Sequence, residues 1–262
     1  MFLLCYSYQS LATNTGFSGD IGFSVMNFNY EEFKENGQLF NREDGIVPGI
    51  KIGMQKNFKQ NFILTTFSYH LNDVNYQGET QAGKQIKTRT DEKIYNLAFQ
   101  FGHQFKKTYH IFPQLYAGLG YFQWQRDIRS TTTTFGLAET YQWWYAIFGT
   151  KGILSLSDKA KLSINFGLTY PINPTIEVDF NDIFTAKKFG LAERWGKMFT
   201  LAWQYQYTDT LDIIIEPYLE HWNFNQSARQ ALMRNGKLVG SFVEPQSKMR
   251  NYGLMIYLRQ TF

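Results

Sequence analysis

The sequence contains little cysteine, no long apolar run and no block of basic residues. Cys5 is the only cysteine among 262 residues, so a disulfide framework or a cysteine-based metal site is excluded. No stretch approaches the roughly 18 consecutive apolar residues of a transmembrane helix, which excludes helical membrane proteins. The net charge of +4 is modest and the basic residues are scattered, which argues against a nucleic-acid partner. We expect no cofactor, no metal and no nucleic acid.

Aromatic residues are abundant instead. They make up 18% of the chain, with 24 Phe and 17 Tyr, yet the mean hydropathy is −0.36. A transmembrane β-barrel has this composition because alternate strand residues face lipid and a polar lumen, while aromatic girdles mark both membrane interfaces. The composition therefore favours an outer-membrane barrel.

Alternation of apolar and polar residues predicts about ten strands, inside the range of outer-membrane barrels. The segments are 18–33, 47–56, 61–75, 93–105, 111–126, 141–154, 161–171, 197–207, 211–222 and 248–262. Each is long enough to cross a membrane when tilted, which takes roughly 9–11 residues.

The predicted links alternate in length. Short links are 57–60, 106–110, 155–160 and 208–210, and long links are 34–46, 76–92, 127–140, 172–196 and 223–247. Short periplasmic turns and long extracellular loops are typical of barrels in the outer membrane of Gram-negative bacteria. The sequence thus predicts an all-β fold: a transmembrane up-and-down antiparallel β-barrel of about ten strands.

Strand parity predicts which side chains point into the lumen. A turn centred on Asp209 pairs Tyr205 with Ile213 on one face and Gln206 with Asp212 on the other, so register and face agree. The predicted lumen-lining charges are Lys51, Lys151, Lys161, Asp212, Glu216, Glu220 and Arg259. Opposite charges in a narrow lumen favour a charge-paired plug over an open path, since barrels of about eight strands are filled and open channels have nearer sixteen.

A few segments depart from simple alternation. Pro217 inside a strand predicts a bulge, because a closed barrel has no free edge for a residue without an N–H. Residues 122–126 lose clean parity, which suggests that their strand extends above the membrane. Residues 179–191 could form one or two helical turns, and 232–242, centred on Asn235-Gly236, reads as a hairpin.

The two ends of the chain carry targeting patterns. Residues 1–12 contain an apolar run ending in small residues and are interpreted as the remnant of a signal peptide, which leaves 13–262 as one barrel domain. The terminus has a polar-x-Gly-x-x-apolar-x-apolar spacing. It resembles the C-terminal insertion signal that the barrel assembly machinery recognises, with the signal residues Asn251, Gly253, Ile256, Leu258 and Phe262. Gln260 departs from that pattern, which usually has an apolar or aromatic residue there.

With the segments YEEFKENGQLFNREDG…PG and EPYLEHWNF, the chain resembles the small outer-membrane barrels grouped as opacity-like or porin-like surface proteins. The resemblance covers nearly all of 13–262. It implies the architecture, the location, and contact with outer-membrane lipid and lipopolysaccharide. It says little about activity, because one fold hosts many functions.

Three functions remain open. The first is a structural or surface-interaction barrel whose outward loops bind an extracellular ligand, and the second is a narrow channel for small solutes or ions. The third is a rim-site enzyme of the omptin type, for which His221 with Asp179 and Asp182 are the candidates. The other histidines, His70, His103 and His110, lie at different predicted heights. We expect the first function and no catalytic residues.

Overall fold

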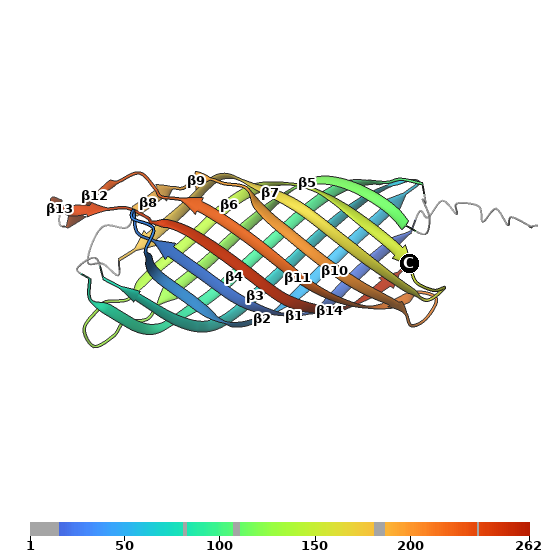
Figure 1. Ribbon diagram of the computed structural model, residues 1–262, viewed down its shortest axis with the longest axis horizontal. Coiled ribbons are helices and arrows are strands. Elements are labelled where there is room, and N and C mark those ends of the chain that lie inside the picture. Colours follow the sequence, from blue (N-terminus) through green and yellow to red (C-terminus); the bar gives the residue numbers. More distant parts are fainter. Residues whose placement is uncertain (1–15, 81–82, 107–110, 181–186, 235) are drawn as a thin grey trace, which may run out of the picture.

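The computed structural model describes residues 16–80, 83–106, 111–180, 187–234 and 236–262. Ten strands of its main sheet form a closed cylinder (Figure 1). They are Phe17–Phe33 (β1), Leu39–Phe58 (β2), Asn61–Glu79 (β3), Gln85–Gln104 (β4), Ile111–Ile128 (β5), Leu137–Ser155 (β6), Ala160–Asp179 (β7), Gly196–Gln206 (β10), Leu211–Asn225 (β11) and Gln246–Thr261 (β14). This confirms the predicted up-and-down antiparallel barrel.

The ring has no free edge. β1 pairs with both β2 and β14, and β10 pairs with both β7 and β11, always antiparallel. Each of the ten strands therefore has a neighbouring strand on each side, as a sheet in lipid requires. Among the described residues, no helix is long and apolar enough to cross a membrane.

Four shorter strands lie at the outer end. Lys187–Gly190 (β8) pairs antiparallel with β7, Ala192–Glu193 (β9) pairs with β11, and Gln230–Arg234 (β12) with Lys237–Phe242 (β13) forms a separate hairpin. Figure 1 shows this hairpin at the end of the cylinder opposite the C-terminus. We call the end with the start of β1, the C-terminus and the short turns the inner end.

The outside of the cylinder carries an apolar belt produced by period-two alternation. On β1 the outward Phe23 is 75% exposed, while its neighbour Ser24 is 1% exposed. The same alternation places Ile256 and Leu258 of β14 outward and Tyr257 inward. Large apolar side chains on the outside of a closed barrel are stable only against lipid, so this belt marks the membrane-spanning part.

Towards the outer end the outward residues become polar while the strands continue. On β5 the last outward aromatic residue is Tyr121, followed by Gln123, Gln125 and Asp127. On β3 the outward Leu71 is followed by Asp73. We call the strands beyond this boundary the projecting part. On β5 it spans about 20 Å along the strand, at roughly 3.3 Å per residue, and it lies outside the lipid.

The predicted long loops are largely strand, so their predicted bounds are wrong. Only residues 34–38 separate β1 from β2, and only 80–84 separate β3 from β4. The reason is physical: strand pairing does not need lipid, and polar outward residues are equally compatible with a ladder in water. The outer surface is therefore a stiff extension of the barrel.

Pro217 does not produce the predicted bulge. It pairs with Leu254 of β14 in unbroken register. On the other side, bridge pairs are lost only between Thr200–Tyr218 and Trp203–Ile215, and the register is the same before and after this gap. The missing N–H is therefore accommodated by a local gap in one ladder instead of an extra residue.

The two other local predictions have opposite outcomes. The predicted helical turns in 179–191 are wrong for the described residues, because Lys187–Gly190 pairs with β7 as a strand. The hairpin at 232–242 is confirmed as β12 and β13, with Gly236 at φ 73°, a value that glycine adopts without strain. Residues 1–12, with Cys5, lie outside the described residues.

Candidate functional site: the barrel interior

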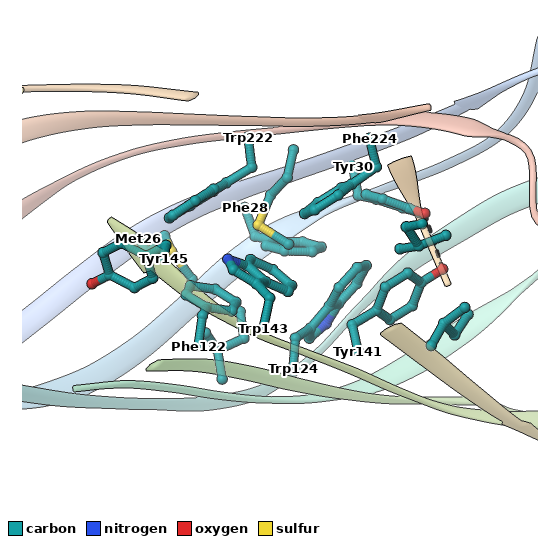
Figure 2. Packing of buried hydrophobic residues seen from close by; sticks show 14 of the residues in the cluster. Met26, Phe28, Tyr30, Phe122, Trp124, Tyr141, Trp143, Tyr145, Trp222 and Phe224 are labelled. Atoms are coloured by element: carbon teal, nitrogen blue, oxygen red, sulfur yellow. Dashed lines mark hydrogen bonds between the residues drawn. The ribbon is translucent and has the colours of Figure 1, made fainter. Parts of the chain in front are cut away.

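Aromatic rings close the lumen near the outer membrane boundary. We call these rings, together with Met26, the aromatic plug: Phe28, Tyr30, Phe122, Trp124, Tyr141, Trp143, Tyr145, Trp222 and Phe224. They come from β1, β5, β6 and β11, which lie on different sides of the ring. Figure 2 shows Trp222 and Phe224 pointing into the barrel from the side opposite Phe122 and Trp143.

The rings of the plug are in direct contact. Phe122 and Trp143 stack with centroids 4.4 Å apart, and Trp143 meets Phe224 at 4.9 Å and Trp222 at 5.3 Å in edge-on geometry. Trp143 is 1% exposed and Trp222 is 0% exposed. Such pairs contribute about 0.5–1.5 kcal/mol each beyond their buried area. Trp143 of β6 therefore contacts Trp222 and Phe224 of β11 across the lumen.

Above the plug, inside the projecting part, one arginine holds several carboxylates. Arg126 of β5 forms ion pairs of 2.9 Å with Glu32, Glu43 and Glu139, which lie on β1, β2 and β6. Its guanidinium also lies over the ring of Tyr30, 4.9 Å from the centroid. We call this group, together with Glu92 and Glu244, the ion cluster.

The remaining members are tied to the cluster through aromatic side chains. The indole of Trp124 donates a hydrogen bond to Glu92, and the Tyr141 hydroxyl donates one of 2.5 Å to Glu244. Tyr141 also lies 3.1 Å from the hydroxyl of Tyr30. The ion cluster and the aromatic plug thus form one continuous buried body.

The ion cluster contains five carboxyl groups and one guanidinium, so its carboxylates cannot all be ionised without strong repulsion. Burial raises the pKa of Glu139 to about 7, against the lowering effect of Arg126. Burial, then the charges of Glu32 and Glu139, raises the pKa of Glu244 well above its ordinary value. Both groups lie in the projecting part or its loops, and they hold protons at mildly acidic pH.

Below the plug the lumen is open. One cavity of about 240 Å³ reaches from Phe122 and Tyr145 down to Arg259, and a second of about 300 Å³ continues to Gly16 and Lys59 at the inner end. The two cavities are adjacent, because six residues line both of them: Gln55, Phe62, Gln114, Ile153, Gln204 and Arg259. We call the two together the inner chamber.

The structure places all seven predicted lumen-lining charges on the walls of the inner chamber. Lys51, Lys151, Glu216 and Glu220 line the first cavity, Lys161 and Asp212 the second, and Arg259 both. Lys51 pairs with Glu216 at 3.1 Å, and Arg259 binds Asp20 through two hydrogen bonds of 2.7 and 2.8 Å. Two of the cations, Lys51 and Arg259, thus pair with carboxylates, and these pairs line open space. The interpretation of these charges as the plug is therefore wrong: aromatic rings close the lumen.

Among the described residues, the histidines His70, His103 and His221 do not form a site with an acid. His70 is buried and lies 3.0 Å from the Ser24 hydroxyl, and His103 lies 2.8 Å from Asn61. His221 sits on β11 between two cations, its strand partners Lys197 and Arg250. His110 and Asp182 lie outside the described residues, and Asp179 lies at the outer end of β7. Within the described chain no group of three His, Cys, Asp or Glu could hold a metal ion.

The sequence interpretation missed the plug and the ion cluster. The signal for part of them was present: inward parity places Phe122, Trp124 and Arg126 on one face of β5, and Glu139 and Tyr141 on the facing side of β6. The loss of parity in 122–126 predicts that this strand extends above the membrane, and the structure confirms that β5 continues to Ile128. It is a regular strand whose outer face is in water.

The insertion-signal residues lie on the last strand and at the terminus. Asn251 is buried and faces inward, whereas Ile256 and Leu258 face outward. Gly253 has the carbonyl oxygen of Val25 2.3 Å from where a Cβ would stand, so a side chain here would collide with β1. Their role as an assembly signal remains a prediction.

No protein-family model matches this chain, and no curated protein does. Among solved structures, the chain is similar to the outer-membrane protease OmpT from Escherichia coli, with 12% identity, a TM-score of 0.70, and coverage of 95% of this chain and 98% of OmpT. Weaker likenesses include OprG from Pseudomonas aeruginosa (10% identity, TM-score 0.43, 95% and 96% covered). The neisserial surface protein NspA is another (11% identity, TM-score 0.35, 93% and 97% covered).

The closed ring, the apolar belt and the OmpT likeness together define the class. The chain is an integral β-barrel protein of the bacterial outer membrane. At 12% identity the likeness to OmpT shows the fold and leaves the role to be argued from the interior.

Proposed function

We propose that this protein is a closed barrel that presents its projecting part and the β12–β13 hairpin to the outside, where they contact an extracellular ligand. The aromatic plug carries the proposal. Trp143 and Trp222 are almost completely buried and touch across the lumen, so the plug leaves no continuous water path. A conducting barrel would need such a path.

The outer tip supports contact with a partner. On β13, Leu238 is 68% exposed and Val239 is 52% exposed, although water surrounds this hairpin. Exposed apolar side chains on an outward hairpin suit a binding surface. The belt contacts outer-membrane lipid, the projecting part contacts lipopolysaccharide, and β14 is read by the assembly machinery during insertion.

Conductance of the purified protein in planar bilayers tests the closed lumen. We expect no ohmic steps from the wild type. The double variant Trp143→Ala, Trp222→Ala removes rings from opposite walls, and we expect it to conduct. The matched control is Trp144→Ala, which deletes the neighbouring indole that faces outward and is 58% exposed.

Two results would contradict the closed lumen. One is reproducible ohmic steps from the wild type that disappear when Glu216 or Lys151 is replaced, which would support the narrow channel. The other is a silent double variant that migrates as a folded barrel on unheated gels, because the plug would then not be the barrier.

The proposal includes no catalytic role. OmpT is a protease, but the strand partners of His221 here are Lys197 and Arg250, and neither can act as an acidic partner for a catalytic histidine. Peptide turnover by the wild type that is lost in His221→Ala would overturn this part. We expect no peptide turnover by the wild type or by the His221→Ala variant.

A further inference from the structure

The inner chamber extends from the aromatic plug to the inner end of the barrel. Phe122 and Tyr145 of the plug line its outer wall, whereas Gly16, Lys59 and Gln60 line its other end beside the inner turns. The plug covers the outer end, so we expect a solute to enter from the inner side. A cavity of about 240 Å³ exceeds the roughly 10–15 Å³ that one water needs, so it has room for a small molecule.

One basic side chain on the wall of the first cavity has no partner among the described residues. Lys51 is bonded to Glu216 and Arg259 to Asp20, whereas Lys151 makes no hydrogen bond or ion pair with any residue in the described part of the chain. The charges acting on Lys151 are Arg259, Lys51, Glu216 and Asp20. Three cations thus face two carboxylates, which leaves one positive charge in excess.

The remaining acids of the chamber do not neutralise Lys151. Glu220 lies higher, beside Trp222 and Asn251, and Asp212 accepts a hydrogen bond from Gln204 near the inner end. An ammonium group enclosed in a barrel wall is costly unless an anion compensates it. Lys151 can donate three hydrogen bonds, and its side chain is flexible enough to meet an anion of variable position.

The surroundings of Lys151 are polar on one side and apolar on the other. Its strand neighbours are Gln114 of β5 and Asn165 of β7. The apolar side chains of Ile147, Met198 and Met255 line the same cavity. A molecule with one anionic group and a short apolar chain would match both kinds of wall.

We propose that the inner chamber binds a small organic carboxylate from the inner side of the membrane, with its carboxylate at Lys151 and its chain against Ile147, Met198 and Met255. Thioether and aliphatic side chains adapt to chains of different shape, so the chamber selects for the anionic group more than for the chain. Binding does not depend on whether the lumen conducts. It therefore fails or succeeds separately from the closed-lumen proposal.

Calorimetric titration of the purified full-length protein in detergent micelles, with butyrate as the probe, tests the site. We expect saturable binding to the wild type and a loss of about tenfold or more in Lys151→Met, because a charge-assisted hydrogen bond is lost. Lys151→Arg keeps the charge and should retain binding. The control Lys159→Met alters an exposed lysine in the turn after β6 and should bind like the wild type.

The wild type alone also provides a test, which holds even if Lys151→Met fails to fold. It must bind butyrate in preference to 1-butanol and to butylammonium, which share the chain but lack the negative charge. Equal binding of butyrate and 1-butanol would overturn the proposal, as would unchanged butyrate affinity in a folded Lys151→Met protein. Absence of saturable butyrate binding to the wild type would overturn it as well.

Discussion

The two ends of the barrel interior use charge in different ways. At the outer end five carboxyl groups surround Arg126, which is 1% exposed and pairs with three of them. At the inner end each of two cations has its own carboxylate, and the pairs stand around open space. The difference shows that a charged lumen is not by itself closed or open. The aromatic side chains of the plug close this barrel. The paired charges of the inner chamber line the space that the plug leaves open.

Removal of Arg126 should have the largest effect on stability. Arg126→Met leaves the carboxylates of the ion cluster without a cation, and breaking a buried pair costs about 3–5 kcal/mol. Urea unfolding in micelles measures the loss, and the emission of Trp124 should shift to the red as water enters. Unchanged stability would show that the cluster is held by protonated carboxyls and needs no guanidinium.

Loss of an inner carboxylate should cost less. Glu216→Gln leaves Lys51 without its ion pair and Tyr257 without a charged acceptor, but water in the chamber can solvate the freed ammonium. We expect the free energy of unfolding to fall by about 1–3 kcal/mol in the same assay. A cost equal to that of Arg126→Met would mean that the inner chamber is as dry as the plug.

The outer end should weaken as the pH rises. The carboxyl of Glu139 has an ordinary pKa of 4.5, which the folded state raises to about 7. Between these values the folded protein binds more protons than the unfolded chain, so the free energy of unfolding falls with increasing pH and the loss is complete above about pH 7. The loss should be gradual because the pKa of Glu244 is raised as well, so two carboxyl groups lose their protons over this range. Unfolding at pH 5 and pH 8 measures it, and Glu139→Gln should flatten the dependence.

The smallest effect is expected from an exposed arginine of the projecting part. Arg129 pairs with Asp91, and both side chains are more than 40% exposed. Surface pairs contribute about 0–1 kcal/mol, so Arg129→Met is the matched control for Arg126→Met. If both variants lost the same stability, burial would not be the source of the difference between them.

Much of the barrel could be predicted from the sequence because period-two alternation reports which face of a strand meets lipid. The inward parity of Lys51, Glu216 and Arg259 follows from this signal alone. The loss of parity at 122–126 indicates that β5 extends above the membrane, but not that it continues to Ile128. Beyond the lipid both faces of a strand carry polar residues, so the contrast on which the prediction depends disappears.

The plug lay beyond prediction for a different reason. Parity states that Trp143 and Trp222 point inward, but it does not state that they meet. Which residues face each other across a barrel depends on strand tilt and stagger, and these are properties of the whole closed sheet. Local sequence patterns therefore predict which residues line the lumen, but not which of them contact each other across it.

The seam between β1 and β14 has a consequence for how the barrel forms. It joins residues nearly a full chain length apart, from Ser18 with Thr261 to Phe33 with Gln246. Contacts of such long sequence separation are slow to form, because the loss of chain entropy precedes any gain from pairing. Until that seam forms, β1 and β14 each leave a row of unsatisfied amides and carbonyls. We therefore expect ring closure to be the slowest step of folding, and chains that lack β14 to remain unclosed.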